Sequence, residues 1–432
     1  MKISDILGLN SRSQLYAYRY NSRRGKNIAD SKIQTAMVLR KHGVAHPKIF
    51  KKFKNPADVY EFDWNKLPDK FALKPSRGLG GEGIIVVKRR LINKESPGNP
   101  MWLTTQKERI TADDLKIHTL DILEGAYSMG NVPDVAFVQE YVGRHLAFRR
   151  WAYRGTPDIR VIVFNKVPVM AMLRLPTKES GGRANLHQGA IGLGVDIATG
   201  ITTKAIWHGN QITVKPGTDK KLKGIKIPNW HRVLETAVNA SIAARLGYMG
   251  VDIVIHPDRG PMVLEMNAQP GLQIQLANME GLKRRLDRVD DLDVVDAEHG
   301  VKIAMALFAG RFADRNSVAE GIKTIGTRER VYVVSDKRKR VEVWAKVDTG
   351  AWRSSIDKAL AKELGIMDKE DVILRKTFKS TLGSEKRPLI NLRYYLAGRR
   401  IDTVVSVADR SHLRRPLIIG RRDLSGYSIK TN

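Results

Sequence analysis

Two apolar runs that fold back on each other between residues 251 and 271 constrain this chain more than any other feature, because acidic side chains interrupt them. A tight turn at residues 256–261 sets Asp252 directly opposite Glu265 on the partner strand. Asn267 follows Glu265 by two positions and therefore points to the same face. Carboxylate and amide oxygens on one spot suit magnesium, especially magnesium that carries nucleotide phosphates. The segment predicts a metal–nucleotide site, and the alternative is a surface hairpin with two solvated acids.

Length and composition indicate a globular protein with more than one domain. The chain has 432 residues, of which 42% are apolar and 28% charged, and chains of this length divide into roughly two or three domains. No apolar run approaches the roughly eighteen residues that a membrane span needs. The amino terminus has no secretory pattern, and the absence of cysteine excludes disulfides and thiolate metal sites. We therefore expect a soluble, cytoplasmic protein with no membrane span.

The formal net charge of +30 predicts an anionic partner. ATP, an acidic peptide, a nucleic acid and an anionic membrane face all meet that condition, so the charge indicates the sign of the partner and not its identity. The basic run at 337–340 is more often a solvated turn than a binding site. Association with a nucleic acid or the ribosome remains an alternative.

Hydrophobic spacing predicts helices over 28–43 and 231–246, and strands over 135–142 and 159–164. Residues 281–310 are mostly helical in pattern. The chain becomes polar near 311–328, and one helix, at 357–364, is expected beyond that point. Short apolar runs there predict a small, mostly β domain, and these runs lie at 331–334, 341–347, 389–396, 401–407 and 417–419.

A glycine-rich segment lies between two strand-like runs from residue 71 to residue 87. Gly78, Gly80 and Gly83 form a G-x-G-x-x-G pattern, with Gly81 between them, but a dinucleotide-binding loop should open a helix and this one leads into β-branched residues. Glycines allow backbone N–H groups to approach phosphate oxygens, while Lys74 on the preceding strand supplies a positive charge. The loop is interpreted as a lid over phosphates, and a plain glycine hairpin is the alternative.

Residues 28–283 resemble the ATP-grasp amide ligases, specifically the branch related to the ligase that adds glutamate to a ribosomal protein. The resemblance implies an α+β, ATP-grasp fold with two lobes around the nucleotide. Relatives carry an additional α/β domain ahead of these lobes, where this chain has only a short segment, so a rebuilt acceptor pocket is expected. The matching segments are Asp30-Ser31-Lys32, Lys74 with its glycine loop, 138–142, Asp158-Ile159-Arg160, Asn185-Leu186-His187, and Asp252, Glu265 and Asn267 with 268–271.

The resemblance also implies a role for each matched residue. Lys32 and Lys74 would contact ATP phosphates, and Glu140 with main-chain groups of the adjoining hinge would hold adenine. The hinge is formed by Gln139, Glu140, Tyr141 and Val142. The residues near the transferred phosphoryl group would be Arg160, Arg174 and Asn185. Two magnesium ions, with manganese as an alternative, would be held by Asp252, Glu265 and Asn267.

Such a site would use ATP to convert a carboxylate into an acylphosphate, which an amine then attacks. Positive groups would neutralise the charge that builds on the phosphoryl oxygens, and the glycine lid would exclude water. Two residues have ordinary alternatives. Arg160 would serve equally well as a structural ion-pair partner, and His187 as a satisfied core histidine.

The carboxyl-terminal region places an acid at the end of an apolar strand, in the turn Asp348-Thr349-Gly350. An apolar run that ends at Gly420 follows later in the chain. The pair resembles retropepsin-like aspartic peptidases, and the domain is expected to be a retropepsin-like barrel in which the second run packs beneath the acidic turn. The ordered set of an Asp-Thr-Gly-Ala start at 348–351, Arg387-Pro388, Asp409-Arg410-Ser411 and a Gly-Arg end at 420–421 resembles a small peptidase-like family often encoded beside such ligases. Asp-Thr-Gly is also a common structural turn.

Aspartic peptidase chemistry needs two carboxylates that share a proton, and this region offers one motif. Either two chains form a dimer through this domain and each contributes Asp348, or the domain binds peptides without cleaving them. The predicted organisation is an extension (1–27), an ATP-grasp ligase domain (28–311), a linker (312–327) and a retropepsin-like domain (328–432). We expect a ligase for an acidic amino acid or peptide, joined to a domain that trims or binds the product. The alternative is a basic, nucleic-acid or ribosome-associated protein whose ATP site is regulatory.

Overall fold

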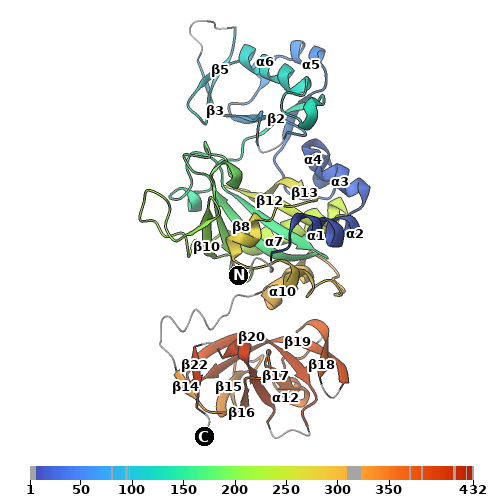
Figure 1. The fold of residues 1–432 in the computed structure, drawn as a ribbon, viewed down its shortest axis with the longest axis vertical. Helices are drawn as coiled ribbons and strands as arrows, with labels where there is room; N and C mark the ends of the chain where they lie inside the picture. Colours follow the sequence, from blue (N-terminus) through green and yellow to red (C-terminus); the bar gives the residue numbers. More distant parts are fainter. Residues whose placement is uncertain are drawn as a thin grey trace. The chain divides into compact units, whose positions relative to one another are not determined.

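The computed structural model divides the chain into two compact units, Met1–Val301 and Lys302–Asn432. The first unit contains two sheets with helices, and the second consists mainly of strands (Figure 1). No helix in the described part of the chain is long and apolar enough to cross a membrane. The residues that the structure describes are 6–78, 81–92, 96, 98–308, 323–368, 371–380, 383–411, 415–424 and 426–430.

The first sheet has the strand order β1-β6-β2-β3-β4-β5, and every pairing in it is antiparallel. Its core contains Phe71 and Trp102, both fully buried, with their rings edge-to-face at 5.6 Å. The capping box of α6, formed by Thr111 and Asp114, fixes where that helix begins. The elements are β1 (Ile49–Phe53), α5 (Pro56–Tyr60), β2 (Phe71–Pro75), β3 (Ile85–Leu91), β4 (Met101–Thr104), β5 (Arg109–Thr111), α6 (Ala112–Leu123) and β6 (Ala136–Glu140).

The second sheet has the order β11-β10-β9-β8-β7-β12-β13. Its central strands are almost continuously apolar and are buried on both faces, which requires helices to cover them. The strands are β7 (Asp158–Phe164), β8 (Val167–Leu175), β9 (Ile191–Val195), β10 (Thr202–Trp207), β11 (Asn210–Ile212), β12 (Tyr248–His256) and β13 (Gly260–Asn267). Further helices of this unit are α4 (Lys32–Lys41), α7 (Trp230–Ala244), α8 (Gln273–Asn278), α9 (Lys283–Leu286) and the start of α10 (Ala297–Phe308).

The amino-terminal residues pack against the second sheet. The side chain of Asn21 donates to the carbonyl of Tyr248 at 2.7 Å and accepts from its N–H at 2.9 Å. The backbone of Leu7 forms two hydrogen bonds with the buried side chain of Gln275, at 2.9 and 3.1 Å. The part of the predicted extension 1–27 that follows residue 6 therefore packs within the first unit. Its elements are α1 (Leu9–Arg12), a π-helical turn (Ser13–Ala17), α2 (Tyr18–Tyr20) and α3 (Arg23–Ala29).

The helix predicted over 28–43 is wrong at its start. Two helices meet there, since α3 ends at Ala29 and α4 begins at Lys32. Ser31 separates them because its side chain accepts a hydrogen bond from the N–H of Gln34 and caps α4. The helical prediction for 281–310 is also too broad, because residues 287–296 lie between α9 and α10 and are not helical.

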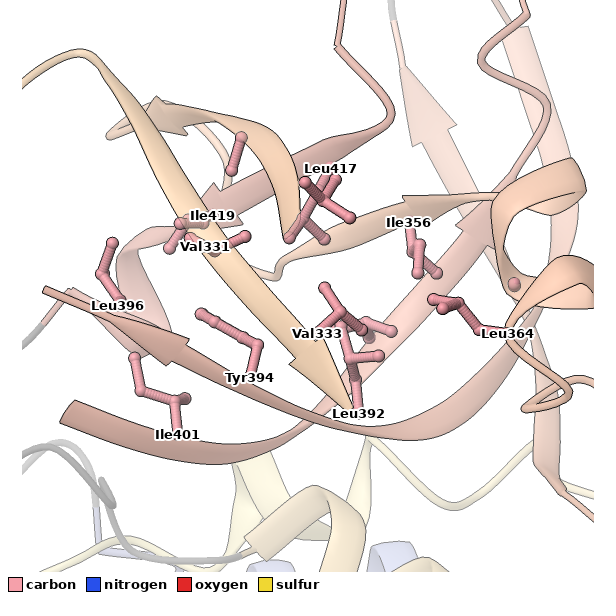
Figure 2. Close-up of a cluster of buried hydrophobic side chains, with 14 of the residues drawn as sticks. Val331, Val333, Ile356, Leu364, Leu392, Tyr394, Leu396, Ile401, Leu417 and Ile419 are labelled. Carbon is pink, nitrogen blue, oxygen red and sulfur yellow. The ribbon is translucent and has the colours of Figure 1, made fainter. Parts of the chain in front are cut away.

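The second unit contains a sheet with the order β15-β16-β21-β17-β20-β19-β18, and a further pairing of β15 with β19 closes six of these strands into a ring. Its core lies inside the ring, and Figure 2 shows Tyr394 among aliphatic side chains such as Val331 and Ile419. The elements are β14 (Lys323–Ile325), β15 (Arg328–Val334), β16 (Arg340–Asp348), β17 (Ser355–Asp357), α12 (Lys358–Glu363), β18 (Val372–Ser380), β19 (Gly383–Leu396), β20 (Arg399–Ala408), β21 (Leu417–Gly420) and β22 (Tyr427–Ile429). Residues 312–322 of the predicted linker lie outside the described residues, and 323–325 form β14.

Candidate active site

A cavity of about 1360 Å³ in the first unit is lined by residues from both sheets. Gln139 and Gly83 are not among the lining residues, and Gly80 lies outside the described part of the chain. Thirteen of the residues proposed from the sequence line the cavity: Lys32, Lys74, Gly78, Gly81, Glu140, Tyr141, Val142, Arg160, Arg174, Asn185, Asp252, Glu265 and Asn267. The structure therefore brings together segments that are far apart in the sequence.

The β12–β13 hairpin has the pairing expected at its acidic positions. Asp252 lies opposite Glu265, and Gly250 lies opposite Asn267. The register shifts just after Asp252, because Ile253 lies opposite Val263 and leaves one extra residue on β13. This bulge is necessary for the site. Without it, the pairing seen between the bulge and the turn would continue along the hairpin and place Leu264, not Glu265, opposite Asp252.

Four alternating charges form a continuous chain across β7, β8 and β12. Arg160 donates to both carboxylate oxygens of Asp252, at 2.7 and 2.6 Å. Arg174 donates to Asp252 at 2.6 Å and holds Asp158 with two further bonds. Asp158 and Arg160 are two positions apart on β7 and therefore share a face, while Arg174 and Asp252 are their cross-strand partners. The order of charges is therefore Asp158, Arg174, Asp252, Arg160.

The two carboxylates of this chain differ in pKa. Burial opposes ionisation of Asp252, but Arg160 and Arg174 outweigh it and hold the pKa of Asp252 well below its ordinary value. Burial and the negative charge of Asp252 raise the pKa of Asp158 to about 6, against the opposing effect of Arg174. Asp252 is thus a permanent anion, and the two arginines are held rigidly at the cavity wall.

The two predicted phosphate-binding lysines lie together near Glu265. Lys32 donates to the carbonyl of Gly78 at 2.9 Å and lies 3.8 Å from a carboxylate oxygen of Glu265. Lys74 donates to the side-chain oxygen of Gln139 at 2.8 Å. Removal from water and the neighbouring charge of Lys32 lower the pKa of Lys74 to about 8, although Glu265 partly opposes this. A pair of close cations favours an anionic ligand between them.

We expect nucleotide affinity to depend on pH through Lys74. Bound phosphates favour the charged ammonium, whereas the free site loses its proton above about pH 8. Affinity for a non-hydrolysable ATP analogue should therefore fall as pH rises from 8 to 9.5. Lys74→Met should remove this part of the dependence and weaken binding at pH 7 by about 1.5–3 kcal/mol. Calorimetric titration across that pH range measures both effects.

The matched control is Lys70→Met, which removes an exposed lysine close to the same strand and does not alter the cavity. It should bind as the wild type does at every pH. Wild-type affinity in Lys74→Met at pH 7 would remove Lys74 from the nucleotide site.

The glycine-rich segment joins two antiparallel strands, β2 and β3, as the sequence predicted. Gly83 adopts a φ of +67°, and a Cβ there would lie 2.5 Å from the ring of Tyr127. Its carbonyl lies 2.9 Å from a ring nitrogen of His118, so this end of the loop is fixed to α6. Gly78 and Gly81 line the cavity, and the carbonyl of Gly78 accepts from Lys32.

The four residues of the predicted adenine hinge do not all face the cavity. Glu140, Tyr141 and Val142 line the cavity, whereas the buried side chain of Gln139 positions Lys74. The carboxylate of Glu140 accepts from the N–H of Lys48 at 3.1 Å and from Arg259. The side chain of Gln139 therefore contacts Lys74, and Gln139 does not line the cavity.

The residues present fit a divalent cation at the end of the β12–β13 hairpin. The side chain of Glu265 is 43% exposed, and its nearest cation, Lys32, is 3.8 Å away, so its oxygens face the cavity. Asn267 also lines the cavity, with its side-chain oxygen accepting from the N–H of Gln269 at 2.8 Å. Asp252, the third predicted magnesium ligand, differs from these two residues because both of its oxygens accept hydrogen bonds from Arg160 and Arg174. Among the described residues, no three histidine or acidic side chains gather as a cation site, so any site here depends on the amide of Asn267 and on ligand oxygens.

Asn185 caps a short turn, where its side-chain oxygen accepts from the N–H of His187 at 3.0 Å. His187 is exposed, lines the cavity and lies 3.4 Å from the amide nitrogen of Gln273, so it is not a core histidine. The sequence analysis included Asp158 in a matching segment but gave it no role, although its position two residues before Arg160 on the same strand was a usable signal. It also missed Arg12, because nothing local in the sequence connects that residue to the cavity.

Asp348 lies in the second unit, at the end of β16. Its carboxylate accepts from the N–H groups of Gly350 and Ala351, at 2.9 and 3.2 Å. β21 runs parallel to β16 and places Gly420 opposite Asp348. A Cβ at Gly420 would lie 2.5 Å from the carbonyl carbon of Arg353, which accounts for glycine at this position.

A buried polar cluster that the sequence did not indicate lies in the same unit. Asp423 accepts from Ser354, from Thr403 at 2.7 Å and from Tyr394 at 3.3 Å. The N–H of Gly420 donates to the hydroxyl of Ser354 at 3.0 Å. Burial and the charge of Asp423 raise the pKa of Tyr394 well above its ordinary value. The cluster ties the Gly420 strand end to the segment that follows Asp348.

The profile of the family described as sugar-transfer associated ATP-grasp matches residues 11–291. The chain belongs to this family. The predicted ATP-grasp fold is thereby confirmed, whereas the finer assignment to the glutamate-ligase branch stays a prediction. The match begins at residue 11 and so includes most of the amino-terminal segment that packs on the second sheet. No curated protein matches the chain.

Several solved structures are similar to parts of this chain. The ATP-grasp ligase PsnB, bound to a phosphomimetic variant of its minimal precursor with magnesium and ADP, is 18% identical over 63% of this chain and 59% of its own, with a TM-score of 0.32. The D-alanine–D-alanine ligase from Bacillus anthracis, bound to ATP, is 14% identical over 65% of this chain and 66% of its own, with a TM-score of 0.34. A protein of unknown function from Legionella pneumophila is 20% identical over 25% of this chain and 93% of its own, with a TM-score of 0.18.

Proposed function

We propose that the first unit is an ATP-dependent carboxylate–amine ligase that forms an amide bond through an acylphosphate. The observation that carries this proposal is the convergence of two lysines, Lys32 and Lys74, with Glu265 and Asn267 on one cavity. Cations for phosphates and hard oxygen ligands for magnesium together suit a magnesium–nucleotide complex. Membership of an ATP-grasp family supports the same reading.

In this proposal each group has a distinct task. Glu265 and Asn267 hold magnesium, which when bound offsets the charge of the phosphate oxygens. Lys32 and Lys74 bind the phosphates, and the backbone of Gly78 and Gly81 covers them. The chain of charges through Asp252 fixes Arg160 and Arg174 in place, so that they meet the charge on the transferred phosphoryl group without reorganisation.

The bonds that change are those of the substrates. A carboxylate oxygen attacks the terminal phosphorus of ATP and the bond to ADP breaks, which gives an acylphosphate. The amine then attacks the acyl carbon and phosphate leaves, with one proton lost from nitrogen. Closure of the loop that contains Gly78 and Gly81 would protect the acylphosphate from hydrolysis. We propose an acidic amino acid or a peptide as the substrate class, in keeping with the net charge of +30.

Product formation tests this proposal directly. The protein is incubated with ATP, magnesium and pooled amino acids and peptides, and ADP and new product masses are recorded together. The proposal predicts ADP in step with a product whose mass is the sum of acid and amine less one water. ADP production that depends on RNA, with no new product, would favour a nucleic-acid-associated ATPase instead.

We propose that the second unit is a retropepsin-like domain that trims or binds the product of the ligase. The closed ring of strands and the turn of Asp348 opposite Gly420 support this proposal. One such turn supplies one carboxylate, so cleavage by paired aspartates requires a dimer in which each chain contributes Asp348. A module that only binds peptides needs no second Asp348.

If the second unit cleaves peptides, Asp348→Asn should abolish cleavage and leave ligation unchanged. Asp348 is partly exposed and only its Oδ1 accepts backbone N–H bonds, so the substitution should leave the fold intact. Sedimentation of the full chain should show a dimer, and cleavage should be fastest on the acidic side of neutrality. Cleavage by a monomer, or cleavage that survives Asp348→Asn, would rule out paired aspartates.

A further inference from the structure

We infer that Arg12 binds a carboxylate of the acid substrate, which enters the site in addition to ATP. The proposed contact lies at the part of the cavity formed by the amino-terminal segment and residues 271–276. This inference rests on the proposed ligase function and deepens it by assigning a recognition group for the acid. Arg12 and Leu9 of α1 line the same cavity as the nucleotide-site residues. The amino-terminal segment is therefore part of the site.

The protein holds Arg12 through neutral groups only. Its Nε donates to the carbonyl of Gly8 at 3.3 Å, and one Nη donates to the carbonyl of Pro270. Among the described residues, no carboxylate lies within ion-pair distance of Arg12. An arginine that is 4% exposed and has no counter-ion in the described part of the chain is costly unless a ligand supplies the negative charge.

Two other arginines that line the cavity differ from Arg12, because carboxylates of the protein pair with them. Arg160 and Arg174 are neutralised by Asp158 and Asp252. Their charge therefore remains in balance before any ligand binds. Arg12 lies on a different segment, beside the carbonyl of Pro270, and the residues that the structure describes supply no carboxylate to it.

A second observation beside Arg12 also indicates an unfilled polar site. The hydroxyl of Tyr248 is buried and has no hydrogen-bond partner among the described residues. Tyr248 is 1% exposed, and burial raises its pKa to about 12 although the charge of Arg12 opposes this. A buried hydroxyl without a partner among the described residues is a cost that a bound water would relieve. Tyr248 does not line the cavity, so the carboxylate site is assigned to Arg12 alone.

The surrounding surface indicates the body of the acid. Leu9, Leu272, Ile274 and Leu276 line the cavity on the segments that carry or adjoin Arg12. Apolar lining with one oriented charge is the usual form of a site for a small organic acid or the carboxyl end of a peptide. A planar guanidinium suits a carboxylate because it can donate two parallel hydrogen bonds.

Titration with defined probes tests the inference. Succinate, L-glutamate and inorganic phosphate are titrated separately into wild type, Arg12→Gln and Arg12→Lys, each with and without a saturating non-hydrolysable ATP analogue and magnesium. Calorimetry gives the affinity, and thermal unfolding reports whether each variant is folded. We expect the two carboxylates to bind the wild type, about tenfold or more weaker binding in Arg12→Gln, and partial recovery in Arg12→Lys.

The matched control is Arg24→Gln, which removes an exposed arginine of the same segment that does not line the cavity. It should bind carboxylates as the wild type does. Equal carboxylate affinity in wild type and Arg12→Gln, absence of carboxylate binding to the wild type, or binding of phosphate alone would each overturn the inference. Failure of the ATP analogue to bind any variant would instead contradict the ligase proposal, and the titrations without nucleotide would still decide the role of Arg12.

Discussion

Glu265→Gln is expected to reduce magnesium-dependent ADP production by at least about a hundredfold, because a neutral amide replaces the charged carboxylate that binds the cation. Substitution of residues that only support metal ligands typically costs about tenfold to a hundredfold, and a change in a ligand itself should cost more. The fold should be nearly unaffected. The side chain of Glu265 is 43% exposed, and its one ion contact, with Lys32, is 3.8 Å long. Substitutions at such positions usually change the free energy of unfolding by less than about 0.5 kcal/mol. ADP production and thermal unfolding are measured on the same preparation.

Glu61→Gln is the matched control, since Glu61 is exposed and does not line the cavity. It should turn over ATP at the wild-type rate. Asn267→Ala should resemble Glu265→Gln in activity, because both residues face the cavity from β13. Wild-type turnover in Glu265→Gln would exclude the hairpin as the metal site.

Asp252→Ala is expected to have the largest effect on stability. The substitution leaves Arg160 and Arg174 at a buried site with only Asp158 as a counter-ion, and breaking a buried pair in this way costs about 3–5 kcal/mol. Chemical denaturation of the nucleotide-free protein measures the change in the free energy of unfolding. Activity should also be lost, because the two arginines would no longer be held in place.

Asp293→Ala removes an exposed carboxylate of the same unit and should leave the free energy of unfolding almost unchanged. If Asp252→Ala lowered the free energy of unfolding by less than about 1 kcal/mol, the two arginines would not depend on Asp252 for their place in the fold. Arg160→Lys separates the two roles of Arg160. If Arg160 is only a structural ion-pair partner, Arg160→Lys should lower stability and activity together. If Arg160 also contacts the phosphoryl group, the loss of activity should be larger than the loss of stability accounts for.

Local sequence pattern predicted the elements of the site whose partners are near in sequence. The strand–turn–strand pattern was sufficient to place Asp252 opposite Glu265, although the pairing depends on a bulge at Leu264 that periodicity does not reveal. Apolar runs located β7 and β21 because buried strands carry continuous hydrophobic residues. Alternation of buried apolar and exposed polar residues located β16. The helix over 28–43 was misplaced because the hydrophobic spacing continues across Ser31. In the structure Ser31 has extended backbone angles and caps α4, so the helix cannot run through it.

The parts that could not be predicted depend on tertiary contacts. Arg12 reaches the cavity only because Asn21 and Leu7 fix the amino-terminal segment to the second sheet, and no local motif encodes those contacts. Gln139 was assigned to the hinge by its position, but the fold turns its side chain toward Lys74. The cluster around Asp423 joins four segments of the second unit, so its members carry no common sequence signal.

Isotope transfer tests the ligase proposal most directly. The protein is incubated with ATP, magnesium and pooled amino acids and peptides whose carboxylates carry ¹⁸O, and released phosphate and new products are analysed by mass spectrometry. An acylphosphate requires that a carboxylate oxygen leave with phosphate. Ligation by this route therefore predicts one ¹⁸O in each phosphate released, in step with an amide product. ATP turnover that gives unlabelled phosphate and no amide product would contradict it.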